Sequence, residues 1–253
     1  DSGVFIISGD GGCGKTAMIK DLYEETSSEL PFYGFKAAEF NVANIQSLFA
    51  LHGNKSLNDF ILAHEHESRK IVLIDSAEKI SDLENQEPIK EFISELVKNS
   101  WTLIFTTRHS YLEDLRFQFL SVFRVSFNEY SIEGLIQSEL ESLSERYVFD
   151  LPENPKLKAL IQNPFYLAEY LRVFQSFSGT LTLSEFKNSI WQRKIQKNSF
   201  TKKNAHINRE KCFLQLIKKR NDMGTFFIIC DECDSDSLAF LQEDEIIGFD
   251  QNT

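Results

Sequence analysis

Gly9-Asp10-Gly11-Gly12-Cys13-Gly14-Lys15-Thr16 is the stretch of this chain that decides its fold. It holds a glycine, four further residues and then Gly-Lys-Thr, which is the phosphate-loop pattern in full. An apolar run at 4–7 precedes it and a helical pattern over 16–25 follows it, as that motif requires. Glycines let the backbone wrap closely, and the N–H groups of a helix N-terminus favour an anion. The stretch therefore predicts a loop that holds nucleotide phosphates between a strand and a helix.

The loop residues are expected to contact ATP or ADP. The Lys15 ammonium is placed to reach the β- and γ-phosphates, and the Thr16 hydroxyl is placed to bind Mg²⁺. Cys13 is interpreted as a small residue that fits the loop rather than as a redox switch, because the sequence offers it no resolving cysteine. The residues expected at the nucleotide are Gly9, Asp10, Gly11, Gly12, Cys13, Gly14, Lys15, Thr16 and Ala17.

A carboxylate follows the clearest apolar strand, which is predicted at 70–75 and ends on Asp75. A phosphate loop needs an acid at the end of a neighbouring strand for its magnesium shell, so Asp75 is predicted to bind Mg²⁺ with Thr16. Glu78 lies three residues further on and is a candidate base for an attacking water. Both acids also have structural interpretations, Asp75 as a helix cap and Glu78 as a first-turn acid that complements the helix dipole.

The next apolar strand, predicted at 101–106, leads into the polar segment Thr106-Thr107-Arg108. We expect this segment at the same sheet edge as the phosphate loop, where ligands of open α/β sheets bind. A polar group there can sense a γ-phosphate, and the Arg108 guanidinium can stabilise charge that develops on it. Arg108 is therefore grouped with Asp75 and Glu78 as catalytic, with an ordinary surface arginine as the alternative.

Strands alternate with helices through about residue 128, with strands predicted at 4–7, 35–40, 70–75, 101–106 and 122–127. This alternation predicts an α/β fold of three layers with a mostly parallel sheet. Beyond residue 128 the pattern becomes helical, and helices are predicted at 132–146, 155–174, 184–197, 208–220 and 237–242.

Composition limits the possible partners. The chain has 253 residues, of which 42% are hydrophobic, enough for one large or two modest domains with a real core. Its net charge of −11 argues against a general nucleic-acid coat. Residues 187–220 nevertheless hold eleven Lys and Arg against the single acid Glu210, which marks either a partner surface or solvated helices. No apolar run approaches the roughly 18 residues that cross a bilayer, so no membrane contact is expected.

The cysteines indicate a reducing compartment. Four cysteines without a regular framework fit the cytoplasm. Cys230 and Cys233 form a lone C-x-x-C pair, and a structural zinc site needs four ligands, so no zinc is expected. The chain begins at Asp1 without a charged n-region or an initiator methionine. We therefore expect a cytoplasmic protein without a secretory signal, of which this sequence is an excised piece.

Taken together, these segments resemble the STAND branch of the AAA+-related ATPases, in particular NACHT-like and bacterial anti-phage sensor ATPases. The resemblance rests on residues 6–16, 73–79 and 104–108, and on Asn163-Pro164-Phe165-Tyr166-Leu167. The last segment is similar to the family's lid-helix motif, whose proline packs against the nucleotide base. The resemblance thus adds Pro164 to the residues expected at the nucleotide.

The resemblance also implies a domain organisation and a role. It implies a phosphate-loop domain over 1–128, a helical lid over 129–180 and a truncated winged-helix-like region over 181–253. It implies a slow ATPase that acts as a switch in defence signalling: ADP holds a closed monomer, and a trigger with ATP opens it to form a homo-oligomer and fire an effector. The effector and sensor regions would lie outside this sequence. Lys79 stands where the family often has a second acid, and the family's winged-helix histidine has no counterpart.

Two other readings remain open from the sequence. One is an AAA+ ATPase of the origin-recognition or loader type, in which residues 187–220 contact DNA. The other is a nucleotide-gated scaffold that binds nucleotide without hydrolysing it. DNA binding with a steep salt dependence would distinguish the first, and the absence of turnover would distinguish the second.

Overall fold

A computed structural model describes residues 3–50, 55–174, 181–196, 205–223, 233, 235–243 and 246–247. The chain divides into two compact units. The first comprises Asp1–Gln137 together with Asn163–Phe165, and the second comprises Ser138–Gln162 and Tyr166–Thr253. The short segment Asn163–Phe165 thus groups with a unit from which it is distant in sequence.

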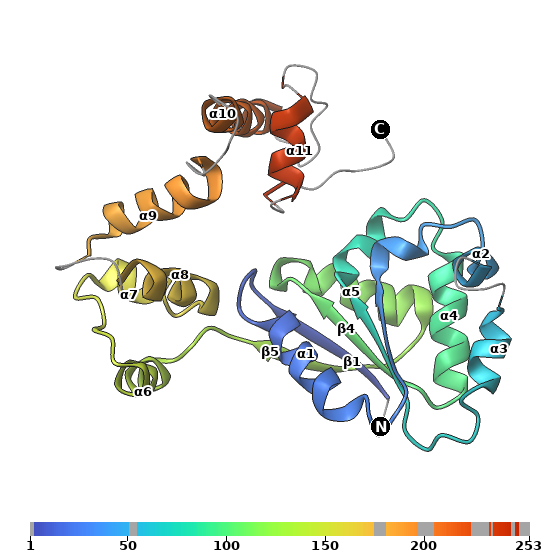
Figure 1. Cartoon of the computed structure of the whole chain (residues 1–253). Coiled ribbons are helices and arrows are strands. Elements are labelled where there is room, and N and C mark those ends of the chain that lie inside the picture. Colours follow the sequence, from blue (N-terminus) through green and yellow to red (C-terminus); the bar gives the residue numbers. More distant parts are fainter. Residues whose placement is uncertain are drawn as a thin grey trace. The chain divides into compact units, whose positions relative to one another are not determined.

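The first unit is built on a five-stranded sheet whose strand pairs are all parallel (Figure 1). The strand order is β2-β3-β4-β1-β5. The strands are β1 (Val4–Gly9), β2 (Phe32–Lys36), β3 (Ile71–Asp75), β4 (Thr102–Thr107) and β5 (Asn128–Ile132). Strands β3, β4 and β1 lie at the centre, and their near-continuous apolar runs are typical of strands that are covered on both faces.

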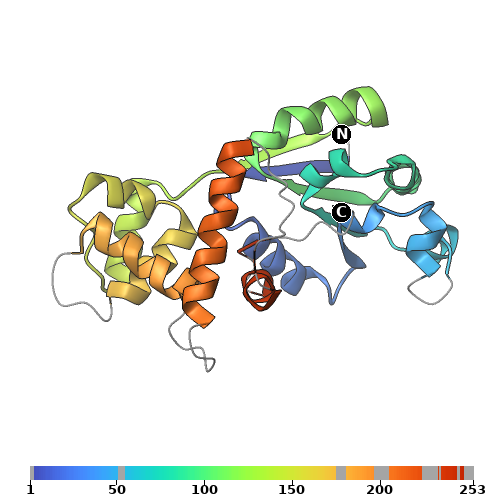
Figure 2. The same cartoon turned by 90° about the horizontal axis from the view of Figure 1, so that it is seen from above.

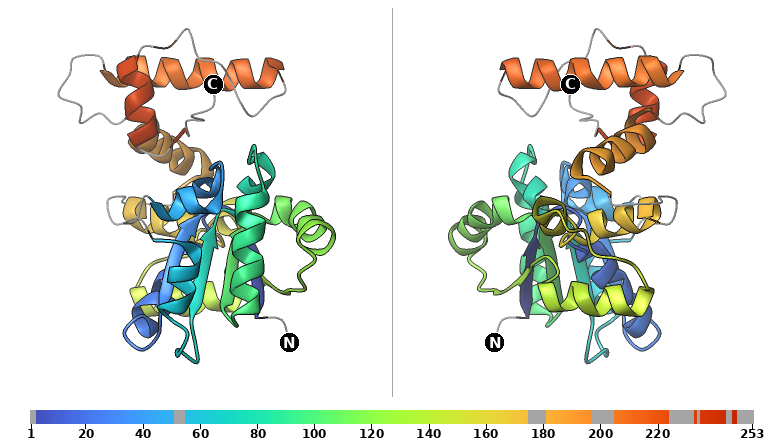
Figure 3. Two further views of the ribbon diagram at one scale, coloured as in Figure 1. Left: turned by 90° about the vertical axis from the view of Figure 1, so that its right-hand side faces the viewer. Right: turned by 90° about the vertical axis from the view of Figure 1, so that its left-hand side faces the viewer.

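Helices cover both faces of this sheet and complete three layers. On one face, Ile19 of α1 (Lys15–Thr26) packs against Ile7 and Ile104. On the other face, α4 (Glu87–Lys98) and α5 (Leu112–Phe117) enclose the main core, which includes Phe92 and Phe105. Figure 3 shows α4 lying along this face in its left view. The predicted three-layer α/β fold is confirmed.

Short elements complete the first unit. They are α2 (Ile45–Ala50), α3 (Leu57–Leu62), the 3₁₀ turns η1 (Ala37–Phe40), η2 (Ala77–Asp82) and η3 (His109–Tyr111), and the π-helical turn η4 (Gln118–Phe123). Arg116 of α5 donates from Nε and Nη2 to the Glu129 carboxylate of β5, at 2.9 and 2.8 Å. This hydrogen-bonded carboxylate raises the pKa of the Arg116 guanidinium. The pair ties the edge strand to the helix layer.

Two of the predicted strands lie elsewhere in the chain. The strand predicted at 35–40 is β2 at Phe32–Lys36, and Ala37 and Phe40 instead turn into the core as part of η1. The strand predicted at 122–127 is wrong, because its apolar residues belong to η4 and to the segment that follows it. Arg124, in the left-handed region at φ 57°, ends η4, and β5 follows at Asn128–Ile132.

The second unit is helical in the part that the structure describes (Figure 2). Its helices are α6 (Gln137–Tyr147), α7 (Pro155–Leu160), α8 (Pro164–Phe174), α9 (Leu183–Trp191), α10 (Ala205–Met223) and α11 (Ser235–Glu243), with the π-helical turn η5 (Gln192–Gln196). Helix α6 begins five residues later than the predicted start at 132. Of the residues that follow α11, only Ile246 and Ile247 are described, so the winged-helix-like region stays a prediction.

Buried polar groups hold the helices of the second unit together. The Glu169 carboxylate is almost fully buried and pairs with Arg193 and, at 3.1 Å, with Arg172. Arg209 is fully buried and donates to the Lys194 carbonyl at 2.8 Å. Glu210 accepts hydrogen bonds from Trp191 Nε1 at 2.7 Å and Gln196 Nε2 at 3.0 Å. Arg193 and Arg209 of the basic stretch 187–220 therefore make ion-pair or hydrogen-bond contacts inside this unit.

Candidate functional site

The glycine-rich loop lies between the end of β1 and the start of α1 (Figure 1). Gly14 caps α1 at φ 100°, and Gly12 has φ 79°, a left-handed conformation that glycine adopts without strain. A Cβ atom at Gly9 would lie 2.6 Å from the Ile132 carbonyl oxygen, so β5 leaves no room for a side chain there. The loop has the backbone that the phosphate-loop pattern predicts.

Lys15 and Thr16 open helix α1 beside the loop. The Lys15 ammonium donates to the carbonyls of Gly9 and Asp10 at 2.6 and 2.9 Å, which keeps it against the loop. Thr16 and Ala17 are exposed in the first turn, which contains no acidic residue. The positive end of the helix dipole is thus not neutralised by the helix itself, and it favours an anion.

Asp75 ends β3 on the same face of the sheet as α1. Leu73, two residues earlier, packs against the cluster of Ile7, Ile19 and Ile104 on the α1 face. Strand residues two apart point to the same face of a sheet, so Asp75 shares the face of Leu73. The Thr106 hydroxyl of β4 donates to Asp75 Oδ1 and accepts from the Ser76 amide at 3.1 Å. Ser76 itself lies in the left-handed region, at φ 58°. Thr106 thus fixes both the Asp75 carboxylate and the turn that follows it.

Glu78 and Arg108 meet at the carboxyl ends of β3 and β4. Glu78 Oε1 lies 3.7 Å from Arg108 Nε. The Glu78 side chain is 14% exposed and that of Arg108 is 65% exposed. Glu78 Oε2 is buried and has no hydrogen-bond partner among the described residues. A buried carboxylate oxygen without a partner fits an acceptor for a proton of a bound water.

These residues fit a nucleotide with Mg²⁺. A carboxylate and a hydroxyl, as supplied by Asp75 and Thr16, are the hard oxygen ligands that Mg²⁺ takes beside phosphate oxygens. The loop and the exits of β3 and β4 lie at one edge of the sheet, because β3, β4 and β1 are parallel neighbours. The structure therefore brings Asp75, Glu78 and Arg108 to the edge that carries the loop.

The start of α8 also contacts the loop. Asn163 Nδ2 donates to the Gly11 carbonyl at 2.9 Å, and the Phe165 amide donates to the Gly12 carbonyl at 3.2 Å. Pro164, which the family resemblance placed at the base, lies between these two contacts. The contact of Asn163 with Gly11 and that of Thr106 with Asp75 were not predicted from the sequence, although Asn163 belongs to a segment that carries the family resemblance. An asparagine before a helix-starting proline was the available signal for the first of these.

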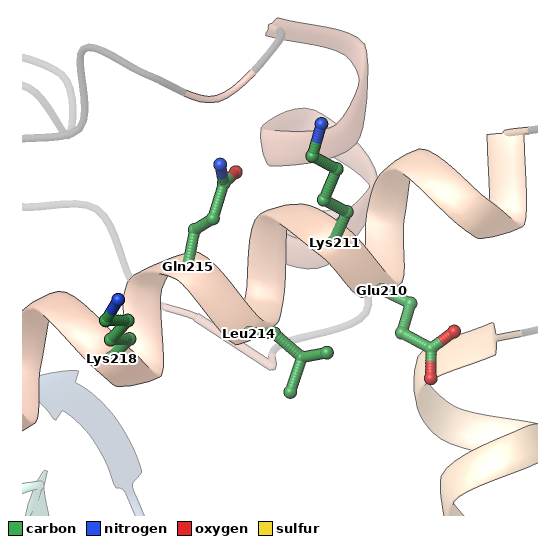
Figure 4. Close-up of a pocket in the computed structure, with 5 residues that line it drawn as sticks. All are labelled: Glu210, Lys211, Leu214, Gln215 and Lys218. Atoms are coloured by element: carbon green, nitrogen blue, oxygen red, sulfur yellow. The ribbon is translucent and has the colours of Figure 1, made fainter.

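Other features of the described residues do not form a site of this kind. A shallow groove runs along α10 and is lined by Glu210, Lys211, Leu214, Gln215 and Lys218 (Figure 4). No group of three or more His, Cys, Asp or Glu side chains with metal-binding geometry occurs among the described residues. Within the same part of the chain, no helix combines the length and apolar character of a membrane span.

The fold and the loop together define a P-loop NTPase, since a parallel sheet in the order 2-3-4-1-5 with the loop after the first strand is an arrangement typical of P-loop and AAA+ NTPases. The chain belongs to the family described as "Novel STAND NTPase 3", whose model matches residues 1–146. None of the curated proteins matches the sequence. The predicted relationship to STAND ATPases is confirmed.

Solved structures of low sequence identity are similar to this chain. A Walker-type ATPase of Pyrococcus abyssi is similar over 100% of this chain and 88% of its own, with a TM-score of 0.51 and 13% identity. The ORC2 protein of Aeropyrum pernix covers 97% of this chain and 73% of its own, with a TM-score of 0.44 and 15% identity. AMPPCP-bound DnaA from Aquifex aeolicus covers 86% of this chain and 74% of its own, with a TM-score of 0.47 and 14% identity. At such identities the likeness concerns the fold alone.

Proposed function

We propose that this chain is the nucleotide-binding core of a regulatory ATPase that binds ATP or ADP with Mg²⁺ and hydrolyses ATP slowly. The observation that carries the proposal is the meeting of Glu78 and Arg108 at the sheet edge that also bears the loop and Asp75. In this proposal Lys15 and the loop amides hold the phosphates, and Thr16 and Asp75 hold Mg²⁺. Glu78 takes a proton from the attacking water, and Arg108 stabilises charge on the γ-phosphate.

The proposed role is that of a switch in cytoplasmic defence signalling. ADP favours the closed monomer, and ATP with a trigger favours a homo-oligomer. Family membership supports a nucleotide-binding NTPase, and the exposed Arg108 supplies a group that can respond to a γ-phosphate. Effector and sensor regions outside this sequence would complete the protein. DNA binding through residues 187–220 is not favoured, because Arg209 is buried and Arg193 is paired with Glu169.

The test of nucleotide binding is the substitution Lys15→Ala, with Lys20→Ala as its matched control. Lys20 lies on the same helix and pairs with Glu24, at 3.6 Å, on the exposed surface. Charge-assisted hydrogen bonds contribute roughly 1.5–3 kcal/mol each, so loss of the Lys15 ammonium should abolish ADP binding in calorimetry. Lys20→Ala should bind like the wild type. Unchanged affinity in Lys15→Ala would refute the phosphate-loop assignment.

Hydrolysis is tested separately with Glu78→Gln, which keeps the shape of the side chain and removes the base. Removal of a general base commonly costs about 10²–10⁴ in rate, so phosphate release should slow by that factor while ADP affinity stays near the wild-type value. Wild-type turnover in Glu78→Gln would place the base elsewhere. A wild-type chain that binds ATP without any turnover would instead be a nucleotide-gated scaffold.

A further inference from the structure

Asn163 and Phe165, at the beginning of α8, hydrogen-bond to the backbone of the phosphate loop, about 150 residues away in the sequence. These two residues form a clamp on the loop. Asn163 Nδ2 donates to the Gly11 carbonyl at 2.9 Å, and the Phe165 amide donates to the Gly12 carbonyl at 3.2 Å. Asn163 Oδ1 in turn accepts from the Phe165 amide at 3.0 Å. One asparagine side chain therefore caps its own helix and binds the loop at the same time.

We propose that Asn163 is a positioning residue for nucleotide binding, which holds the phosphate loop in its binding conformation through the Gly11 carbonyl. This inference rests on the proposed function of the loop, and it differs from a contact of Pro164 with the base. Asn163 need not touch the nucleotide in order to act. It acts on the peptide units whose N–H groups face the phosphates.

The geometry of the peptide bond explains how a carbonyl contact can orient an amide. A peptide unit is planar and trans, so its C=O and N–H point in opposite directions. Fixing the Gly11 carbonyl on Asn163 therefore fixes the direction of the Gly12 N–H. The next peptide unit is held at both ends, by Phe165 at the Gly12 carbonyl and by the Asp10 carbonyl, 3.3 Å from the Cys13 amide.

The clamp matters because the loop is rich in glycine. Glycine loses more conformational freedom on ordering than any other residue, so an unrestrained loop would occupy its binding conformation only part of the time. The apparent affinity of a ligand falls in proportion to that fraction. Contacts that order the loop before the nucleotide arrives consequently raise the affinity without touching the ligand.

The packing between the loop and the segment Asn163–Phe165 is close enough to transmit this restraint. A Cβ atom at Gly12 would lie 2.7 Å from Phe165 Cβ and 3.0 Å from Asn163 Oδ1. Gly12 also has φ 79°, so any other residue there would be strained and would push against Asn163 and Phe165. The loop and the start of the helix therefore fit each other only while position 12 is a glycine.

The test is Asn163→Ser, with Asn154→Ser as the matched control. A serine at either position can still cap its helix, but its hydroxyl is too short to replace the Asn163 amide at Gly11. Asn154 also precedes a proline at a helix start, and its Oδ1 accepts from the amides of Lys156 and Leu157 at 3.0 and 3.1 Å. The two variants thus alter the same kind of cap, and only one of them releases the loop.

Two readouts are measured on the full chain. The first is ADP affinity by calorimetry, which should weaken about fivefold in Asn163→Ser, as expected for one lost hydrogen bond. The second needs no nucleotide: it is the alkylation rate of Cys13, which is buried in the loop and 6% exposed. Mass spectrometry of the peptide that contains Cys13 should show faster alkylation in Asn163→Ser than in the wild type.

Asn154→Ser should match the wild type in both readouts, and thermal melting should show that both variants fold. The proposal is overturned if Asn163→Ser leaves Cys13 alkylation unchanged, or if Asn154→Ser produces the same changes. Failure of the wild-type chain to bind ADP would contradict the proposed function instead. In that case the Cys13 measurement would still report whether Asn163 holds the loop.

Discussion

The single hydroxyl group of Thr106 makes two hydrogen bonds. Its Oγ1 donates to Asp75 Oδ1 and accepts from the Ser76 amide, so both the donor and the acceptor capacity of the group are used. The side chain is 2% exposed, which leaves water little access as a substitute partner. Ser76 also needs support, because a left-handed backbone costs a non-glycine residue roughly 1–2 kcal/mol. Thr106 therefore couples the proposed metal ligand to a strained turn.

We predict that Thr106→Val weakens Mg²⁺-dependent ADP binding more than ADP binding without Mg²⁺. Valine has nearly the same shape, but it leaves the Asp75 carboxylate free to rotate and the Ser76 amide unpaired. A buried unpaired group costs about 1–3 kcal/mol, so urea unfolding should show a loss of stability of that size. Calorimetry with and without Mg²⁺ measures the effect on the site.

Thr107→Val is the control for this prediction, and Thr106→Ser is the rescue. Thr107 is equally buried, but it lies on the opposite face of β4, and its hydroxyl makes a long hydrogen bond of 3.4 Å to the Arg108 carbonyl. Thr107→Val should leave the Mg²⁺ dependence of ADP binding unchanged. Thr106→Ser should restore the Mg²⁺ dependence that Thr106→Val loses. If Thr106→Val keeps the Mg²⁺ dependence of the wild type, Asp75 does not need Thr106 for its position.

At the scale of the elements, two helices begin with the same reciprocal cap. In α9, Thr182 and Glu185 form a capping box, and in α3, Ser56 and Asp59 form another. Hydrogen bonds from the Thr182 hydroxyl and backbone lower the pKa of the Glu185 carboxyl below its ordinary value of 4.5. The Ser56 hydroxyl and backbone lower the pKa of Asp59 in the same way. The ionised carboxylate is therefore the form that favours both caps.

The direction of these shifts fixes how each cap responds to pH. A carboxyl whose pKa is lower in the folded state stabilises that state above its unfolded pKa, and the contribution is lost as the pH falls through the folded value. We predict that the first turn of α9 loses protection from hydrogen exchange below about pH 4.5, relative to intrinsic rates. Glu185→Gln should remove that pH dependence in α9 and leave it in α3. Asp59→Asn should do the reverse, and an unchanged acid response in Glu185→Gln would contradict the assignment.

The elements also show what the sequence could and could not predict. The central strands β1, β3 and β4 were predicted because they are covered on both faces and read as apolar runs. The edge strand β5 has the sequence Asn-Glu-Tyr-Ser-Ile, which carries no such signal. The apolar run just before it was mistaken for a strand. Phe123 at the end of the helical turn η4, and Val125 and Phe127 after it, all pack against the core, which leaves the pattern of a buried strand.

The same contrast holds for the candidate site. The loop, Asp75 and Arg108 were accessible as local motifs, because each follows a recognisable apolar strand. The clamp by Asn163 was not, since no local pattern reports a hydrogen bond between residues about 150 apart. The role of Thr106 depends on the pairing of β3 with β4, which places Asp75 next to it across the sheet.

At the scale of the whole molecule, the proposed switch needs a group that distinguishes ATP from ADP. Moving a switch from 1:99 to 99:1 needs a difference of about 5.5 kcal/mol between the two states. Loop contacts common to both nucleotides cannot supply that difference, so it must come from a group that responds to the γ-phosphate. Arg108 is the candidate, because its guanidinium is exposed and its partner Glu78 holds it at 3.7 Å rather than in a tight pair. A γ-phosphate would offer it a stronger anionic partner.

We therefore predict that Arg108→Ala impairs assembly driven by ATP. The measurement is the oligomer size of the full-length protein by light scattering, with ADP and with a non-hydrolysable ATP analogue plus trigger. Arg69→Ala is the control, because Arg69 is also exposed but precedes β3, at the opposite end of that strand from Asp75. The wild type and Arg69→Ala should assemble with the analogue plus trigger and not with ADP, whereas Arg108→Ala should remain small under both conditions while still binding ADP. If Arg108→Ala assembles as readily as the wild type, another residue senses the γ-phosphate, and the Glu78–Arg108 pair serves only to hold the exits of β3 and β4 together.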